Sequence, residues 1–228
     1  MVRELSRLYS KLIFSKESFV VVRFSFIILA LDWFISSSLP AEVGWENGII
    51  ENAQVVVLAM GVILSRSFAC YCKKGGFRGV TDIFLLMVGR ELSWGRVFLT
   101  PTEVTDMGPC FPSMKTLAYW PVVYLCIGLL MLKILYNFYR EIDWKFYLQK
   151  PIPLGFLVII FISVIMHYLG EHNMIYGLTH GQSQIYEEIA ELVIYINLLY
   201  LTLYYGFLTV VAREKIKWQL SIDKRLEV

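Results

Sequence analysis

One stretch, residues 167–191, contains all three histidines of the chain together with a group of glutamates. Its imidazole and carboxylate groups belong to His167, Glu171, His172, His180, Glu187, Glu188 and Glu191. Imidazole nitrogen and carboxylate oxygen are ligands for zinc, iron and manganese, and crowded carboxylates also act as general acids and bases. The stretch is therefore a candidate for metal-dependent or acid–base chemistry.

Helical spacing groups some of these side chains on shared faces. His167 and Glu171 are four residues apart, while Glu188, Glu191 and Tyr195 follow an i, i+3, i+7 pattern. A catalytic zinc takes three protein ligands and leaves one position open for water. We predict a divalent metal such as zinc, with ligands drawn from His167, Glu171, His172, Glu188 and Glu191. None of the spacings matches a zinc motif such as HExxH, and His172 and His180 have an alternative interpretation as loop residues near lipid headgroups.

Further polar residues occur in apolar surroundings earlier in the chain. In GRELSWGR, Arg90 and Glu91 are predicted catalytic residues together with Glu188. The alternative for Arg90 is a structural role as counterion of nearby carboxylates. The remaining members of the predicted polar cluster are Asp32, Glu46, Glu51, Asn52, Gln54, Trp94 and His180.

The elements that would position these residues are membrane helices. The 228 residues are 57% hydrophobic and 18% charged, which is typical of an integral membrane protein. A helix of about 20 residues crosses the hydrocarbon core. We predict an all-α fold with a single domain over residues 1–228 and six transmembrane helices near 18–39, 49–71, 79–100, 117–138, 152–170 and 184–211.

The basic residues predict the orientation of the bundle. Lys and Arg are frequent in the tails at 1–17 and 213–228 and in the loops after the second and fourth helices, whereas the alternate loops contain only Lys115. Under the positive-inside rule both termini are cytoplasmic. The costly polar residues of several helices then fall at one level near the external side, where they are expected to line a pocket.

Two segments, together with the late His and Glu residues, carry a resemblance to known families. WENGIIENAQ (45–54), the RELSWG core (90–95) and the late His and Glu residues resemble bacterial multi-pass inner-membrane proteins. They are also similar to the alkaline ceramidase-like membrane hydrolases, a resemblance that implies a zinc site with Ser, Asp and His. The residues that match are Glu46, Asn47, Glu51, Ser93, Asp106 and the late histidines. The chain departs from that family at Val97 and Glu171, where the family has histidines, and in having six predicted helices instead of seven.

These observations favour a membrane-embedded enzyme, such as a metal-dependent hydrolase or transferase that acts on a lipid or lipid-linked substrate. A non-catalytic subunit is the first alternative, in which the polar cluster fixes helix packing or docks another membrane protein. Proton or ion movement through Asp32, Glu51, Glu91 and Glu188 is the second. The net charge of +2, spread over short clusters, does not indicate a nucleic-acid partner.

Overall fold

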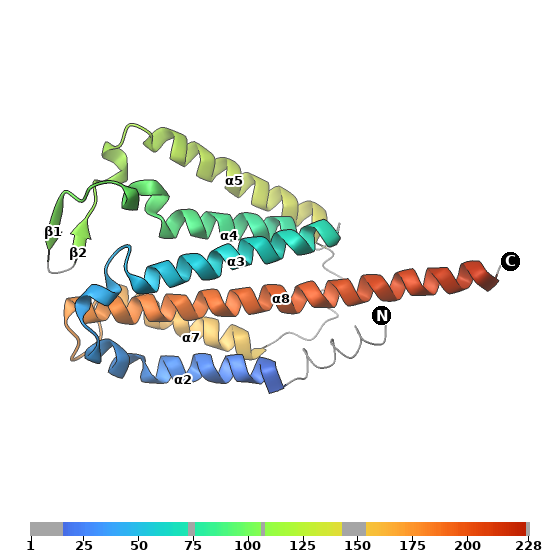
Figure 1. Ribbon diagram of the computed structural model, residues 1–228, viewed down its shortest axis with the longest axis horizontal. Coiled ribbons are helices and arrows are strands. Elements are labelled where there is room, and N and C mark those ends of the chain that lie inside the picture. The colour runs from blue at the N-terminus through green and yellow to red at the C-terminus, as the bar shows by residue number, and fades with distance from the viewer. Residues whose placement is uncertain (1–15, 73–75, 106–107, 143–153, 227–228) are drawn as a thin grey trace.

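The computed structural model describes residues 16–72, 76–105, 108–142 and 154–226, and long helices that run side by side account for most of them (Figure 1). The long helices are α2 (Lys16–Ser38), α3 (Ile49–Tyr71), α4 (Phe77–Glu91), α5 (Trp120–Glu141), α7 (Leu154–Glu171) and α8 (His180–Leu226). Shorter 3-10 helices are η1 (Ala41–Gly44), η2 (Ser93–Phe98) and η3 (Met114–Thr116). Strands β1 (Glu103–Thr105) and β2 (Gly108–Cys110) pair antiparallel in a small hairpin.

Five segments of the described chain are long and apolar enough to cross a membrane, and they cover all or most of α2, α3, α5, α7 and α8. This confirms the prediction of an all-α, multi-pass membrane protein. The remaining long helix, α4, has 15 residues. At 1.5 Å per residue it is about 22 Å long, shorter than the hydrocarbon core of about 30 Å. The sixth crossing and the orientation of the termini therefore stay predictions, and residues 1–15 of the predicted basic tail lie outside the described residues.

The predicted helix over 79–100 is wrong at its end. Helix α4 stops at Glu91 because the next residues leave the right-handed helical region, with φ of 53° at Trp94 and 94° at Gly95. Such positive φ values interrupt an α-helix. The chain turns through η2 instead, so Trp94 does not share a helical face with Arg90. The other long helices begin and end within a few residues of their predicted bounds, except that α8 continues to Leu226.

Helix α8 is the central element of the bundle and packs against α2, α3 and α7. Small and branched apolar residues form the contacts, such as Leu29, Ile159, Ala190 and Val193 where α2, α7 and α8 meet. A second buried group, Leu58, Phe84 and Tyr195, joins α3 and α4 to α8. Helix α8 therefore packs with one side against α2 and α7 and with another side against α3 and α4.

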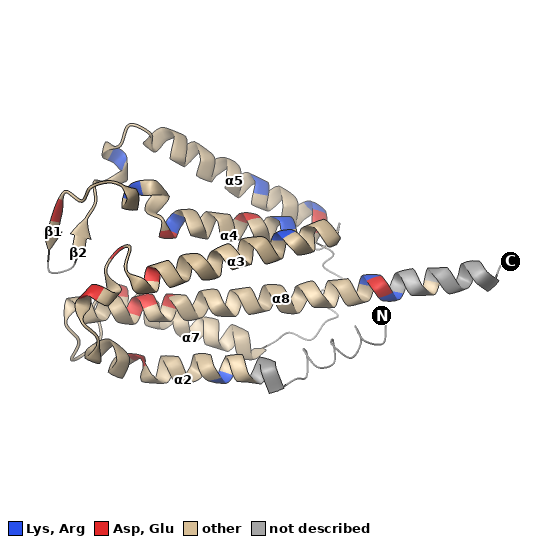
Figure 2. Ribbon diagram, in the orientation of Figure 1, with Lys and Arg blue, Asp and Glu red and all other residues tan. Residues whose placement is uncertain are grey.

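One end of the bundle, which we call the hairpin end, contains η1, η2, the β1–β2 hairpin and the turn between α7 and α8 (Figure 1). Acidic side chains gather at this end of α3, α4 and α8, as Figure 2 shows. The sequence-based expectation that several helices present costly polar residues at a common level is therefore met in the described chain.

Helix α5 lies at the edge of the bundle, where its long-helix packing is mainly against α4. The two helices are close at the end far from the hairpin and diverge toward the hairpin end (Figure 1). Lys133 of α5 forms an ion pair with Asp82 of α4 at 2.7 Å, and the Asn137 amide donates to the other Asp82 oxygen at 2.8 Å. These polar contacts hold α5 to α4.

Candidate functional site

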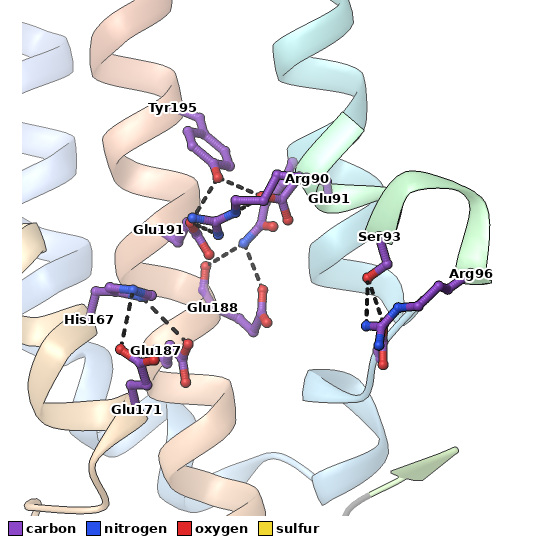
Figure 3. Close-up of polar contacts among 12 residues, drawn as sticks. Arg90, Glu91, Ser93, Arg96, His167, Glu171, Glu187, Glu188, Glu191 and Tyr195 are labelled. Atoms are coloured by element: carbon purple, nitrogen blue, oxygen red, sulfur yellow. Dashed lines mark hydrogen bonds and ion pairs between the residues drawn. The ribbon is translucent and has the colours of Figure 1, made fainter. Parts of the chain in front are cut away.

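A polar network joins the end of α4 to α8 (Figure 3). Arg90 and Glu91 are the last residues of α4, and Nε of Arg90 donates to the Glu91 carboxylate at 3.1 Å. Another nitrogen of the same guanidinium, Nη2, contacts the carboxylate of Glu191 on α8. The Tyr195 hydroxyl lies 2.6 Å from a Glu91 oxygen and 2.7 Å from a Glu191 oxygen. One guanidinium and one hydroxyl therefore hold two carboxylates from different helices.

The network is buried on its carboxylate side and exposed on its guanidinium side. Glu91, Glu191 and Tyr195 are 6%, 5% and 2% exposed, whereas the side chain of Arg90 is 56% exposed. A buried carboxylate is costly unless charged or hydrogen-bonding groups compensate it. The arginine supplies that compensation while part of it remains accessible from outside the bundle.

Glu188, one turn before Glu191 on α8, faces α3. The Gln54 amide nitrogen donates to the Glu188 carboxylate at 2.8 Å and to its main-chain oxygen at 2.9 Å. Gln54 is completely buried, and its side-chain oxygen Oε1 has no hydrogen-bond partner in the described part of the chain. The position of its nitrogen between two acceptors fixes the orientation of the amide. Glu188 makes no ion pair with a described residue.

Two predicted residues at the start of α3 differ in their contacts. Glu51 is 9% exposed and accepts a hydrogen bond from the main-chain N–H of Asn47. The exposed Asn52 side chain donates to the main-chain oxygens of Asn47 and Gly48, at 3.0 and 2.7 Å. Asn52 therefore stabilises the turn before α3, whereas the carboxylate of Glu51 is buried, as those of Glu91 and Glu191 are.

Glu46 lies beside η2 and contacts residues that follow α4. The Ser93 hydroxyl donates to Glu46 at 2.8 Å, and the Arg96 guanidinium lies 3.3 Å from the same carboxylate (Figure 3). Trp94 instead folds back over α4, with its ring against Gly89. This cluster connects the turn before α3 to the turn after α4 and lies apart from the histidines.

His167 belongs to a separate group between α7 and α8 (Figure 3). Its Nδ1 lies 3.6 Å from Glu187 and its Nε2 lies 4.0 Å from Glu171. Helical spacing predicted the approach to Glu171. Glu187 was not among the predicted site residues, because spacing within one helix gives no information about contacts between two helices.

The two later histidines lie in less enclosed places. His172 follows the end of α7, where its ring packs on Tyr168 with 4.2 Å between centroids. His180 is the exposed first residue of α8. Among the residues that the structure describes, no three His, Cys, Asp or Glu side chains group as a metal site. The predicted zinc ligands divide between the His167 group and the α8 carboxylates, so the zinc site stays a prediction.

Asp32 of α2 is fully buried, and the Ser36 hydroxyl donates to one of its oxygens at 3.1 Å. The other oxygen has no partner among the described residues. The structure therefore places this predicted member of the polar cluster inside the bundle, where its described hydrogen bond is to Ser36 and not to the Arg90 network.

An apolar groove approaches the network from the side of α5. It has a volume of about 390 Å³ and is lined by α4, α5 and α8. Met87 of α4 and Leu198 of α8 line the part nearest the hairpin end. Glu91 follows Met87 by four residues, and Tyr195 precedes Leu198 by three, so both continue the helix faces that line the groove.

Comparison of the chain with protein-family models, with curated proteins and with solved structures gave no match. The resemblance to the ceramidase-like hydrolases therefore stays a prediction. Of its matching residues, Glu46 and Ser93 are in contact, whereas the late histidines lie elsewhere and Asp106 is outside the described residues.

Proposed function

We propose that the protein is a membrane-embedded enzyme that acts by acid–base catalysis on a lipid or lipid-linked substrate. The observation that carries this proposal is the apolar groove whose helix faces continue into the Arg90, Glu91, Glu191 and Tyr195 network. Ligand sites combine an apolar lining with a few convergent polar groups, and this groove has the volume of such a site.

The number of protons that the contacts of Tyr195 require supports proton exchange in the network. A hydroxyl group has one proton, yet the Tyr195 oxygen makes short contacts with two carboxyl groups. Both contacts are satisfied when either Glu91 or Glu191 carries a proton of its own. A carboxyl group that gains and loses a proton in this place is suited to general acid–base work.

Glu188 is the best candidate for the base. It is close in sequence to Glu191 on the same face of α8, and its carboxylate accepts a hydrogen bond from the neutral amide of Gln54. Arg90, whose side chain is 56% exposed, is positioned to donate hydrogen bonds to an oxygen of the substrate. The metal-dependent form of hydrolysis or group transfer would add an ion near His167, and that form also stays a prediction.

The proposal includes an orientation. The resemblance to bacterial multi-pass proteins favours a bacterial inner membrane. The basic tails and loops favour cytoplasmic termini, so that the hairpin end faces outward. The site would then lie near the headgroups of the outer leaflet.

Lipid turnover tests the proposal. Wild type, Glu188→Gln and Glu91→Gln are reconstituted in nanodiscs made from a total bacterial lipid extract, and lipid species are followed by mass spectrometry. Removal of a general acid or base costs roughly 10²–10⁴-fold in rate, so we expect a product with wild type and at least about a hundredfold slower formation with the variants. Glu103→Gln, in the exposed part of β1, is the control and is expected to keep the rate. The proposal is contradicted if the wild-type protein leaves the lipid profile unchanged. It is also contradicted if the two carboxylate variants form product at the wild-type rate.

A second candidate function follows from the contacts of Arg90. Since its guanidinium and Tyr195 satisfy carboxylates from two helices, the network can act as a structural lock between α4 and α8 in a non-catalytic subunit. In that case no lipid is converted, a partner protein co-purifies in mild detergent, and Glu91→Gln lowers the stability of the protein.

A further inference from the structure

The chemistry at the polar end of the groove identifies the class of lipid. We propose that the groove binds one hydrocarbon chain of a zwitterionic phospholipid, with the ammonium group of its headgroup at Glu188 and Gln54 and its phosphate at Arg90. This inference rests on the proposed function and names the substrate class of the same site.

The polar residues continue the helical rows of α4 and α8 that line the groove. On α4, Ile83 and Met87 line the groove, and Arg90 continues the same row at i+7 from Ile83. On α8, Leu198 and Thr202 line the groove, and the row continues backward through Tyr195, Glu191 and Glu188. A chain that lies in the groove therefore leads its headgroup to these polar residues.

The length of the groove suits a lipid chain. Its α4 lining extends from Phe77 to Met87. Ten residues of helix extend about 15 Å at 1.5 Å per residue. That is about half of a hydrocarbon core of about 30 Å.

Next to Glu188, one buried acceptor has no donor among the described residues. Oε1 of the fully buried Gln54 is an acceptor with no partner, and the neighbouring Glu188 has only acceptor atoms when ionised. Leaving such a buried acceptor unsatisfied is costly. An ammonium group has three donors and a positive charge, which satisfies the amide oxygen and complements the surplus of carboxylates over arginine in the network.

Arg90 provides the complementary half of the headgroup site. Its two recorded carboxylate contacts use Nε and Nη2, and 56% of the side chain remains exposed. Guanidinium groups bind phosphate through several parallel N–H donors. A purely anionic headgroup would gain this contact but would face Glu188 and Glu191 without a compensating cation.

Lipid binding, measured without turnover, tests the inference. The full-length protein is delipidated in detergent and titrated with phosphatidylethanolamine, phosphatidylglycerol or diacylglycerol of identical chains, and bound lipid is counted by native mass spectrometry. Charge-assisted hydrogen bonds contribute enough to discriminate by about tenfold or more. We expect phosphatidylethanolamine to bind at least about tenfold more tightly than either other lipid, and Gln54→Leu to abolish that preference.

Groove-filling variants separate the chain site from the headgroup site. Met87→Trp and Leu201→Trp, on opposite walls of the groove, are expected to weaken binding of all three lipids by about tenfold or more, whereas Val122→Trp on the exposed surface of α5 is expected to bind as wild type. Two walls are tested so that misfolding of one variant leaves the other informative.

Equal binding of the three lipids, tighter binding of phosphatidylglycerol, or wild-type binding by both groove variants would overturn the inference. The inference would also be overturned if a second copy of the chain occupied the groove. That result would appear as a dimer that dissociates in the Met87→Trp variant and does not dissociate when lipid is added.

Selective binding without conversion would uphold this inference and refute the proposed catalysis. Conversion of a lipid that lacks an amine would refute the headgroup assignment and uphold the proposed catalysis.

Discussion

Tyr195 contacts both buried carboxylates of the network through one hydroxyl group, as Arg90 does through its guanidinium. Its neighbours Glu188 and Glu191 share its face of α8, and helical spacing predicted that arrangement from the sequence. The contact with Glu91 depends on how α4 packs against α8. Similarly, several carboxylates were equally plausible partners for Arg90 in the sequence, and only the packing of the helices selects Glu91 and Glu191.

Replacing Tyr195 by phenylalanine isolates this hydroxyl. The change removes both O–H contacts and leaves the ring in the core formed with Leu58 and Phe84. Hydrogen bonds to charged groups contribute about 1.5–3 kcal/mol, so we expect Tyr195→Phe to destabilise the protein by about that amount. Unfolding in detergent, followed by circular dichroism, measures the loss.

Tyr200→Phe on the same helix is the matched control, because the Tyr200 ring stacks on Phe156 and its hydroxyl has no hydrogen-bond partner among the described residues. Equal stability of the two variants would show that the Tyr195 hydroxyl contributes nothing to the network.

At the scale of helices, the sequence predicted most segments but failed at α4. Apolar runs of sufficient length located α2, α3, α5, α7 and α8 because the hydrocarbon core demands such runs. The end of α4 depends on positive φ angles at Trp94 and Gly95, and the sequence offered only the glycine as a weak signal of that turn. The longer predicted helix placed Trp94 on the same face as Arg90, whereas the observed turn places the Trp94 ring against Gly89.

Close packing between α7 and α8 provides a test at this scale. A Cβ atom at Gly170 would lie 3.0 Å from both the Cα and the main-chain nitrogen of Glu187. Since main-chain atoms cannot rotate away, Gly170→Ala is expected to push α7 from α8 and to cost about 1–3 kcal/mol of stability. Gly128 on α5 has no atom within 4 Å of such a Cβ, so Gly128→Ala is expected to be neutral or slightly stabilising. Thermal unfolding of both variants in detergent measures the difference, and equal midpoints would contradict the close approach.

For the whole molecule, the decisive question is whether α4 crosses the membrane. Six crossings place the two termini on the same side, whereas the five candidate spans without α4 would place them on opposite sides. The basic loops predict that both termini are cytoplasmic. Fusions of green fluorescent protein to either end, expressed in a bacterial host, are expected to fluoresce, because this reporter folds in the cytoplasm. Fluorescence from only one of the two fusions would show an odd number of crossings.

The account depends most on the claim that the groove and the carboxylate network form one lipid site. A structure determined by electron microscopy, with the protein in nanodiscs that contain phosphatidylethanolamine, tests this claim directly. We predict elongated density along Phe77 to Met87, ending in a headgroup within hydrogen-bonding distance of Arg90 and Glu188. A groove closed by α5, or a lipid whose headgroup points away from the hairpin end, would contradict it.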